Sequence, residues 1–346
     1  MRKWIIGLFL LCFVVQPVSA VDFTAPVVPE SAQQYMPDER ETFAEGLWYI
    51  LKSAVFSLRP ELKDASGICL SLIAVVMLLS ILTNFSASST NVIRPITAVS
   101  IGILLLEQTN SLIKLGAQTV TELSEYGKLL IPVMTAAVAA QGGGTTSAAL
   151  YTGTVFFNSL LTTFIARIII PALYIYLCLC IAVCAVEQDT LKRVREFVKW
   201  LMTWSLKWIL YIFTGYISIT GVVSGTVDAS ALKAAKIGIS GAVPVVGSIL
   251  ADATETILVS AGVMKNAAGV YGIFAVLAVC VGPFLQIGVL YGMLKFSGIV
   301  CNVFGYKPAG ELIKDFSSGM GLVLAMTGTV CILLLISLVC FMKGMG

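Results

Sequence analysis

Residues 238–265 form an apolar stretch whose first half is interrupted by helix-breaking residues, and this stretch constrains the fold most. The interruptions are Gly238, Gly241, Pro244 and Gly247. A simple spanning helix needs about 20 consecutive apolar residues, and broken backbone at membrane depth is tolerated only where protein or a water-filled cavity covers it. We therefore predict either a re-entrant element that faces an interior path or an amphipathic helix that lies on the membrane surface.

The composition indicates a membrane protein. Of the 346 residues, 58% are hydrophobic and 12% are charged, whereas a soluble globular chain has about 25% charged residues. We predict an all-α, polytopic integral membrane protein with about 6–8 spanning helices and two re-entrant hairpins broken by Pro and Gly. The net charge of +3 is too small to indicate a nucleic-acid partner.

The sequence does not indicate an enzyme. It contains no His, which removes the commonest general base and the commonest metal ligand. The nucleophile-elbow motif and the P-loop motif are also missing from it. We therefore predict no catalytic, cofactor-binding or metal-binding residue.

Three parts are predicted along the chain. Residues 1–20 have the basic start, apolar core and small-residue end of a cleavable signal peptide. Residues 21–66 are acid-rich and carry a helical apolar pattern after Pro37, which indicates an extracytoplasmic amphipathic segment. Residues 67–346 are the polytopic membrane domain.

The membrane domain contains several apolar runs. Candidate spans are 67–85, 92–113, 148–186, 200–225, 268–294 and 318–342. Residues 128–147 are apolar but short and interrupted, and like 238–265 they are predicted to form a re-entrant hairpin. Residues 148–186 are long enough for one tilted helix or for a tight pair of helices. The basic loops 187–199 and 295–315 are predicted to be cytoplasmic, because positively charged loops stay inside.

An internal repeat is a further prediction. A shift of 112 residues places Pro132 on Pro244 and Pro171 on Pro283. With this shift, residues 92–186 and 204–298 become two parallel copies of one unit. Duplicated halves with broken helices at the working site are typical of transporters and channels. Chance spacing of the prolines is the alternative.

Charges and prolines at membrane depth supply the candidate functional residues, because buried charges are costly in lipid. The candidate path-lining or gating residues are Pro132, Gly241, Pro244, Gly247, Asp252 and Glu255. Asp252 and Glu255 share a face if their stretch is helical, and that face either lines a path or is solvated. Arg167 is a candidate buried charge or a side chain that reaches the headgroups, and Pro171 and Pro283 are candidate helix kinks.

One run resembles a known family. Residues 214–266, TGYISITGVVSGTVDASALKAAKIGISGAVPVVGSILADATETILVSAGVMKN, closely resemble the stage III sporulation protein AE family of endospore-forming Firmicutes, and the resemblance extends with less specificity over 67–342. It implies a component of the complex that links mother cell and forespore, in the mother-cell-derived outer forespore membrane. The implied partners are stage III sporulation proteins AA to AH and stage II sporulation protein Q.

The leading hypothesis is a non-enzymatic channel or export-platform subunit, which forms a homo-oligomer in the lipid bilayer. Its broken hairpins would line or gate a path. The alternative is a self-sufficient secondary transporter that couples an ion through Asp252 or Glu255, and a third interpretation is a scaffold that only anchors partners. A ring-shaped assembly would favour the channel, whereas a monomer or dimer would favour the transporter.

Overall fold

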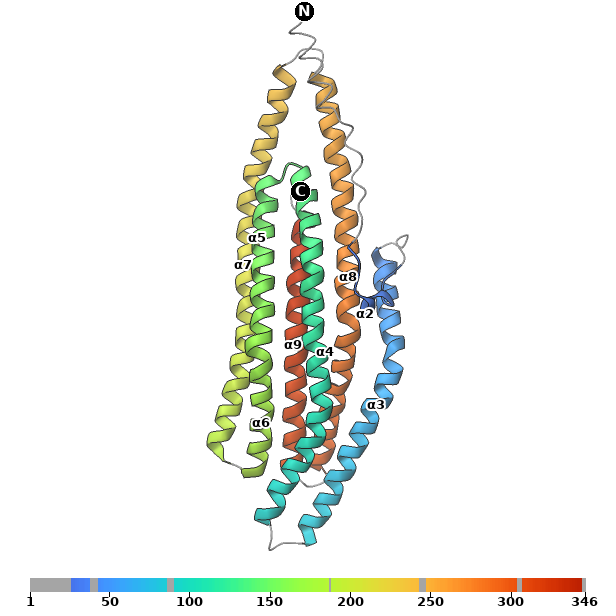
Figure 1. The fold of residues 1–346 in the computed structure, drawn as a ribbon, viewed down its shortest axis with the longest axis vertical. Helices are drawn as coiled ribbons and strands as arrows, with labels where there is room; N and C mark the ends of the chain where they lie inside the picture. Colours follow the sequence, from blue (N-terminus) through green and yellow to red (C-terminus); the bar gives the residue numbers. More distant parts are fainter. Residues whose placement is uncertain are drawn as a thin grey trace, which may run out of the picture.

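The apolar runs of the membrane domain lie within helices in the computed structural model of the chain (Figure 1). The structure describes residues 26–37, 43–85, 90–186, 188–242, 247–303 and 307–343. The side chains of residues 59–61, 64, 79, 82–85, 90–94 and 221–265 are outside this description. The predicted signal peptide, residues 1–20, also lies outside the described residues.

The described elements are all helices, which confirms the predicted all-α class. They are α2 (Glu30–Gln33), α3 (Phe43–Phe85), α4 (Thr90–Ala140), α5 (Gly144–Phe164), the π-helical turn η1 (Ile165–Ile169), α6 (Ile170–Val186), α7 (Asp189–Ala242), α8 (Gly247–Val303) and α9 (Lys307–Lys343). α5, η1 and α6 follow one another without a gap and form one rod. α3 continues across the boundary predicted at residue 67, because the apolar pattern of both sides is helical.

The rods run along the long axis of the molecule and alternate in direction (Figure 1). The α4–α5 connection and the facing ends of α7 and α8 lie toward the upper end of the view. The facing ends of α6 and α7, and those of α8 and α9, lie toward the lower end. The two basic loops at 187–199 and 295–315 therefore share one end of the bundle. This is consistent with the prediction that both lie on the same side of the membrane. Their cytoplasmic location stays a prediction.

α9 lies at the centre of the bundle and contacts α4, α5, α6, α7 and α8. α3 is peripheral and packs mainly on α8. Because lipid supplies no hydrophobic driving force between helices, close packing has to hold such a bundle together. On α8, a Cβ added to Gly298 would lie 3.2 Å from the carbonyl oxygen of Gly310 on α9. Glycine therefore permits the close approach of these two backbones.

Residues 128–147 do not form the predicted separate re-entrant hairpin. α4 continues through Pro132, whose side chain is exposed. The helix ends at Ala140, Gly142 in the following turn has a φ of 90°, and the Gly143 amide donates to the carbonyl of Val138 at 3.1 Å. These are features of the Schellman motif, in which a glycine terminates a helix. The chain therefore reverses at Gly142 rather than at Pro132.

The stretch 238–265 corresponds to the junction of α7 and α8. α7 ends at Ala242 and α8 begins at Gly247, while Pro244 lies in 243–246, outside the described residues. In Figure 1 the end of α7 and the start of α8 project beyond the α4–α5 connection. This stretch is thus part of a long helical hairpin and not a separate short one.

The helix bounds do not follow the predicted 112-residue register, and the repeat stays a prediction. Shifted by 112, the turn at residues 141–143 falls on 253–255, which lie within α8. Pro132 lies inside α4, whereas Pro244 lies between α7 and α8, so the two prolines are not equivalent. A long helix tolerates a proline that costs it one hydrogen bond, so the spacing of two prolines does not by itself define a repeat. Pro283 is a second such case, inside α8.

Four of the described helical rods are long and apolar enough to cross a membrane: Pro95–Ala140, Gly144–Val186, Asn266–Val303 and Lys307–Lys343. They have 37 to 46 residues and hence span about 55–69 Å, about twice the hydrocarbon thickness of about 30 Å. This indicates a multi-pass membrane protein whose rods extend beyond the hydrocarbon layer. The predicted count of about 6–8 spans stays a prediction.

Candidate functional site

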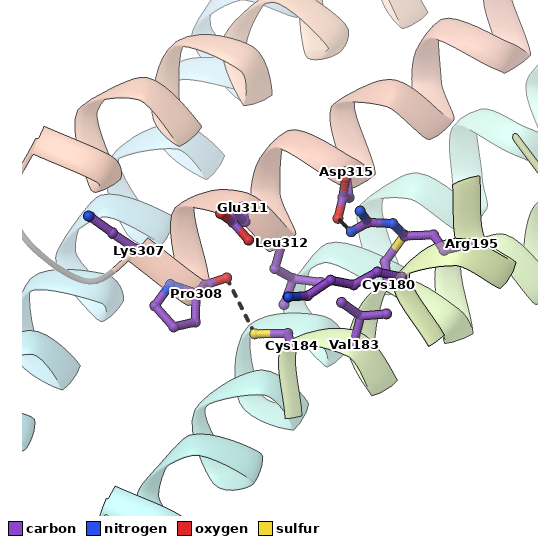
Figure 2. Close-up of a pocket in the computed structure, with 10 residues that line it drawn as sticks. Cys180, Val183, Cys184, Arg195, Lys307, Pro308, Glu311, Leu312 and Asp315 are labelled. Carbon is purple, nitrogen blue, oxygen red and sulfur yellow. Dashed lines mark hydrogen bonds and ion pairs between the residues drawn. The ribbon is translucent and has the colours of Figure 1, made fainter. Parts of the chain in front are cut away.

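An ion pair joins the N-terminal parts of α7 and α9. The guanidinium of Arg195 donates from Nη1 to Oδ2 of Asp315 (Figure 2). The two side chains are only 14% and 18% exposed. Nη2 of Arg195 also lies 3.6 Å from Oε1 of Glu196, a largely exposed carboxylate. Because partial burial strengthens the attraction and makes a lone charge costly, each partner depends on the other.

α6 completes this contact region. The Tyr176 hydroxyl donates to the backbone carbonyl of Asp315 at 3.2 Å. Further along α6, toward its C-terminal end, the Cys184 thiol donates to the carbonyl of Pro308 at 3.3 Å (Figure 2). We call Tyr176, Arg195 and Asp315 the charged junction. It ties α6, α7 and α9 together at the end of the bundle that carries the basic loops.

A small cavity adjoins the charged junction. It has a volume of about 130 Å³, and its charged lining residues are Lys192, Arg195, Lys307, Glu311 and Asp315 (Figure 2). This volume has room for a few water molecules. It is well below the range of about 300–1,000 Å³ that is typical of small-molecule sites. The cavity therefore fits hydration of the ion pair better than a substrate.

A second polar cluster joins α4, α5 and α9 with uncharged side chains. Asn158 Nδ2 donates to Ser124 Oγ at 3.1 Å. One turn earlier on α5, Thr154 Oγ1 donates to Ser337 Oγ at 3.2 Å. All four residues are buried, and we call them the neutral layer. Asn158 Oδ1 is buried without a hydrogen-bond partner among the described residues, so this amide is only partly satisfied.

Most of the predicted path-lining residues belong to the α7–α8 hairpin. Gly241 lies at the end of α7, Gly247 is the first residue of α8, and Asp252 and Glu255 lie in the first turns of α8. Their side chains are outside the described part of the structure, as is the whole of Pro244. Whether these residues line a path therefore stays a prediction.

Pro171 lies two residues after the end of the π-helical turn. The Ile170 amide donates to the carbonyl of Ile165, five residues back. Pro171 has no amide hydrogen to give to the carbonyl of Arg167, and the wider turn accommodates this loss. The side chain of Arg167 is exposed on this chain, and whether it is buried in an assembly or reaches the headgroups stays a prediction. The kinks predicted at Pro171 and Pro283 stay predictions.

Neither polar cluster is evident from the sequence. Arg195 and Asp315 are 120 residues apart, and nothing local to either segment indicates its partner. Asn158 offers a weak signal, since it is an amide within the apolar run 148–186. Such a residue in a membrane helix usually bonds to a neighbouring helix.

The long apolar rods around α9, with polar contacts between them, define a multi-pass helical membrane protein. Comparison with known families then identifies the family to which the chain belongs. The family model of stage III sporulation protein AE matches residues 31–344, so the chain belongs to that family.

A curated relative supports this assignment. Stage III sporulation protein AE of Bacillus subtilis (strain 168) is 23% identical to this chain over 236 residues, which make up 68% of this chain and 59% of the relative. The matched region therefore covers less than two thirds of the length of that relative. No solved structure matches the chain.

Proposed function

We propose that this chain is a membrane subunit of the channel or export apparatus between mother cell and forespore, and that forespore development requires it. The observation that carries the proposal is the family match over residues 31–344, which includes every described helix from α3 to α9. The subunit would lie in the mother-cell-derived outer forespore membrane. Its partners would be stage III sporulation proteins AA to AH and stage II sporulation protein Q.

In this proposal the α7–α8 hairpin lines or gates the path. Asp252 and Glu255 are the charges on this hairpin that would make such a path polar, since an unpaired carboxylate is costly against lipid. Several copies of the chain would surround the path. A partner ATPase would supply energy, because this sequence has no P-loop motif.

The role is tested by deleting the gene in the source organism and complementing it. We expect few mature spores without the gene and normal numbers with the wild-type copy. The double variant Asp252→Asn/Glu255→Gln should fail to restore spores. The matched control is Glu107→Gln/Glu125→Gln, two exposed carboxylates on α4, which should restore them.

The outcomes separate the two parts of the proposal. Normal spore numbers in the deletion strain would contradict the sporulation role. Full restoration by Asp252→Asn/Glu255→Gln would leave that role intact but remove the polar path. Loss of transport with a normally assembled complex would exclude a scaffold that only anchors partners.

The mass and symmetry of the detergent-extracted protein distinguish the channel from the transporter. A closed ring of identical subunits is expected for a channel, because such oligomers adopt closed symmetry. A monomer or dimer that carries out ion-coupled uptake in vesicles would instead establish the secondary transporter.

A further inference from the structure

A ladder of aromatic rings lies on the exposed side of α7. Its members are spaced by three or four residues, and about half of each side chain is exposed: Phe197, Trp200, Trp204, Trp208 and Tyr211. Successive ring centroids from Phe197 to Trp208 are 6.0, 5.7 and 5.4 Å apart. We call these five residues the aromatic ladder. Large exposed apolar surface of this kind usually marks a contact with a partner or a membrane.

The ladder is not the core face of α7. Buried side chains of the same helix, such as Met202, Leu206 and Phe213, belong to the hydrophobic core. At 3.6 residues per turn these positions lie on the side of the helix opposite the ladder. α7 therefore has one apolar face that the chain covers and a second one that it leaves open.

The open face changes in polarity along the helix. Arg193 precedes the ladder by one turn and is exposed. The rings come next, with the exposed Lys207 at their flank. Beyond them, Ile212 and Ile219 are exposed. Apart from Lys207, which lies beside Trp208, the order of cation, aromatic ring and aliphatic side chain matches the order of headgroup, interface and hydrocarbon that a helix meets when it enters a bilayer.

We infer that this face of α7 binds the surface of one leaflet and prefers anionic phospholipid. Arg193 and Lys207 supply the charge complementarity, because basic residues beside a membrane attract anionic headgroups. From Phe197 to Tyr211 the ladder covers about 21 Å. It thus extends from the headgroups into the outer part of the acyl chains.

Tryptophan fluorescence of the full chain in vesicles tests this inference. The chain has five Trp, and Trp4→Phe/Trp48→Phe leaves only the three of the ladder as probes. We expect strong quenching by phospholipid brominated on the acyl chain and weak quenching by acrylamide. In mixed vesicles, brominated phosphatidylglycerol should quench more than brominated phosphatidylcholine, since basic residues beside a membrane attract anionic headgroups.

Charge variants separate the cations from the rings. In the same Trp background, Arg193→Gln/Lys207→Gln should abolish the preference for phosphatidylglycerol and leave quenching by phosphatidylcholine in place. The matched control is Lys114→Gln/Lys128→Gln, two exposed lysines on α4, which should retain the preference.

Three results would overturn the inference. Protection of the ladder from both brominated lipid and acrylamide would show that a second copy or a protein partner covers it. Dominant quenching by acrylamide would place it in water. Equal quenching by the two lipids in the parent protein would remove the anionic preference.

Discussion

The charged junction and the neutral layer both hold α9 against its neighbours, but they use different chemistry. In the junction, Arg195 and Asp315 retain some exposure and adjoin a cavity of about 130 Å³. In the layer, Thr154, Asn158 and their partners are buried and carry no charge. Full charges therefore occur where water can reach them, and neutral hydrogen bonds occur where it cannot.

The difference follows from the cost of removing polar groups from water. An unpaired ion in an apolar interior costs far more than an unpaired amide or hydroxyl. The partly satisfied Asn158 is thus tolerable in the layer, whereas an unpaired Arg195 would not be. The junction should accordingly respond strongly to the loss of one partner, and the layer weakly.

The largest effect is expected for Asp315→Asn. This change leaves Arg195 without its main partner and should cost about 2–4 kcal/mol, toward the lower part of the range for buried pairs because the site is partly hydrated. The measurement is the apparent melting temperature of the detergent-solubilised protein, which is read from the loss of its monodisperse peak on heating. Glu311→Gln is the matched control, because this carboxylate lines the same cavity but is exposed.

Removing both charges sharpens the same test. The double variant Arg195→Met/Asp315→Leu should melt at a higher temperature than Asp315→Asn, because apolar side chains leave no uncompensated charge. If the double variant were as unstable as the sum of its single changes, the junction would not act as a pair.

The next effect is expected at the α5–α7 contact beside the layer. Gly153 precedes Thr154 and packs against the ring of Tyr216, so that an added Cβ would clash with Cε1 of that ring. Tyr216 is also fixed by its hydroxyl, which donates to the carbonyl of Ala149 at 3.1 Å. Gly153→Ala should therefore cost about 1–3 kcal/mol through overpacking.

A glycine on the partner helix provides the control for this prediction. Gly215 has no atom within 4 Å of an added Cβ, so Gly215→Ala should be neutral or stabilise α7 by up to about 1 kcal/mol. Equal melting temperatures for Gly153→Ala and Gly215→Ala would show that the close contact with Tyr216 is not maintained in solution.

The contrast between the two clusters also shows how far the sequence predicts this protein. Hydropathy and helical periodicity are local properties, and they predict the helices and their apolar faces. Element boundaries were less accurate, because α4 continues through Pro132 and ends at Ala140, just before the turn at Gly142. The pairing of Arg195 with Asp315 depends on how α7 and α9 pack. Such contacts between distant segments are set by the whole bundle, and one sequence does not reveal them.

A small effect is expected for Thr154→Val in the neutral layer. Thr154 donates to Ser337, while Ser337 donates to the carbonyl of Leu333 at 2.9 Å. The substitution removes one donor but leaves the Ser337 hydroxyl bonded, so it should cost about 0.6 kcal/mol, the average for such bonds in membrane proteins. A double-mutant cycle with Ser337→Ala measures the coupling. A coupling above about 2 kcal/mol would mean that the layer matters as much as the charged junction.

The smallest effect is expected for the ion pair between Asp189 and Lys192 at the start of α7. Their charged atoms are 3.3 Å apart, but the side chains are 82% and 36% exposed. An exposed pair gains little over hydration, so Asp189→Asn should cost at most about 0.5 kcal/mol. That cost should vanish at high salt, because salt screens exposed charges more than buried ones. Asp315→Asn measured in the same salt series should keep most of its cost. If both penalties disappeared together with salt, the charged junction would be an ordinary surface pair, and its distinction from the neutral layer would have no energetic basis.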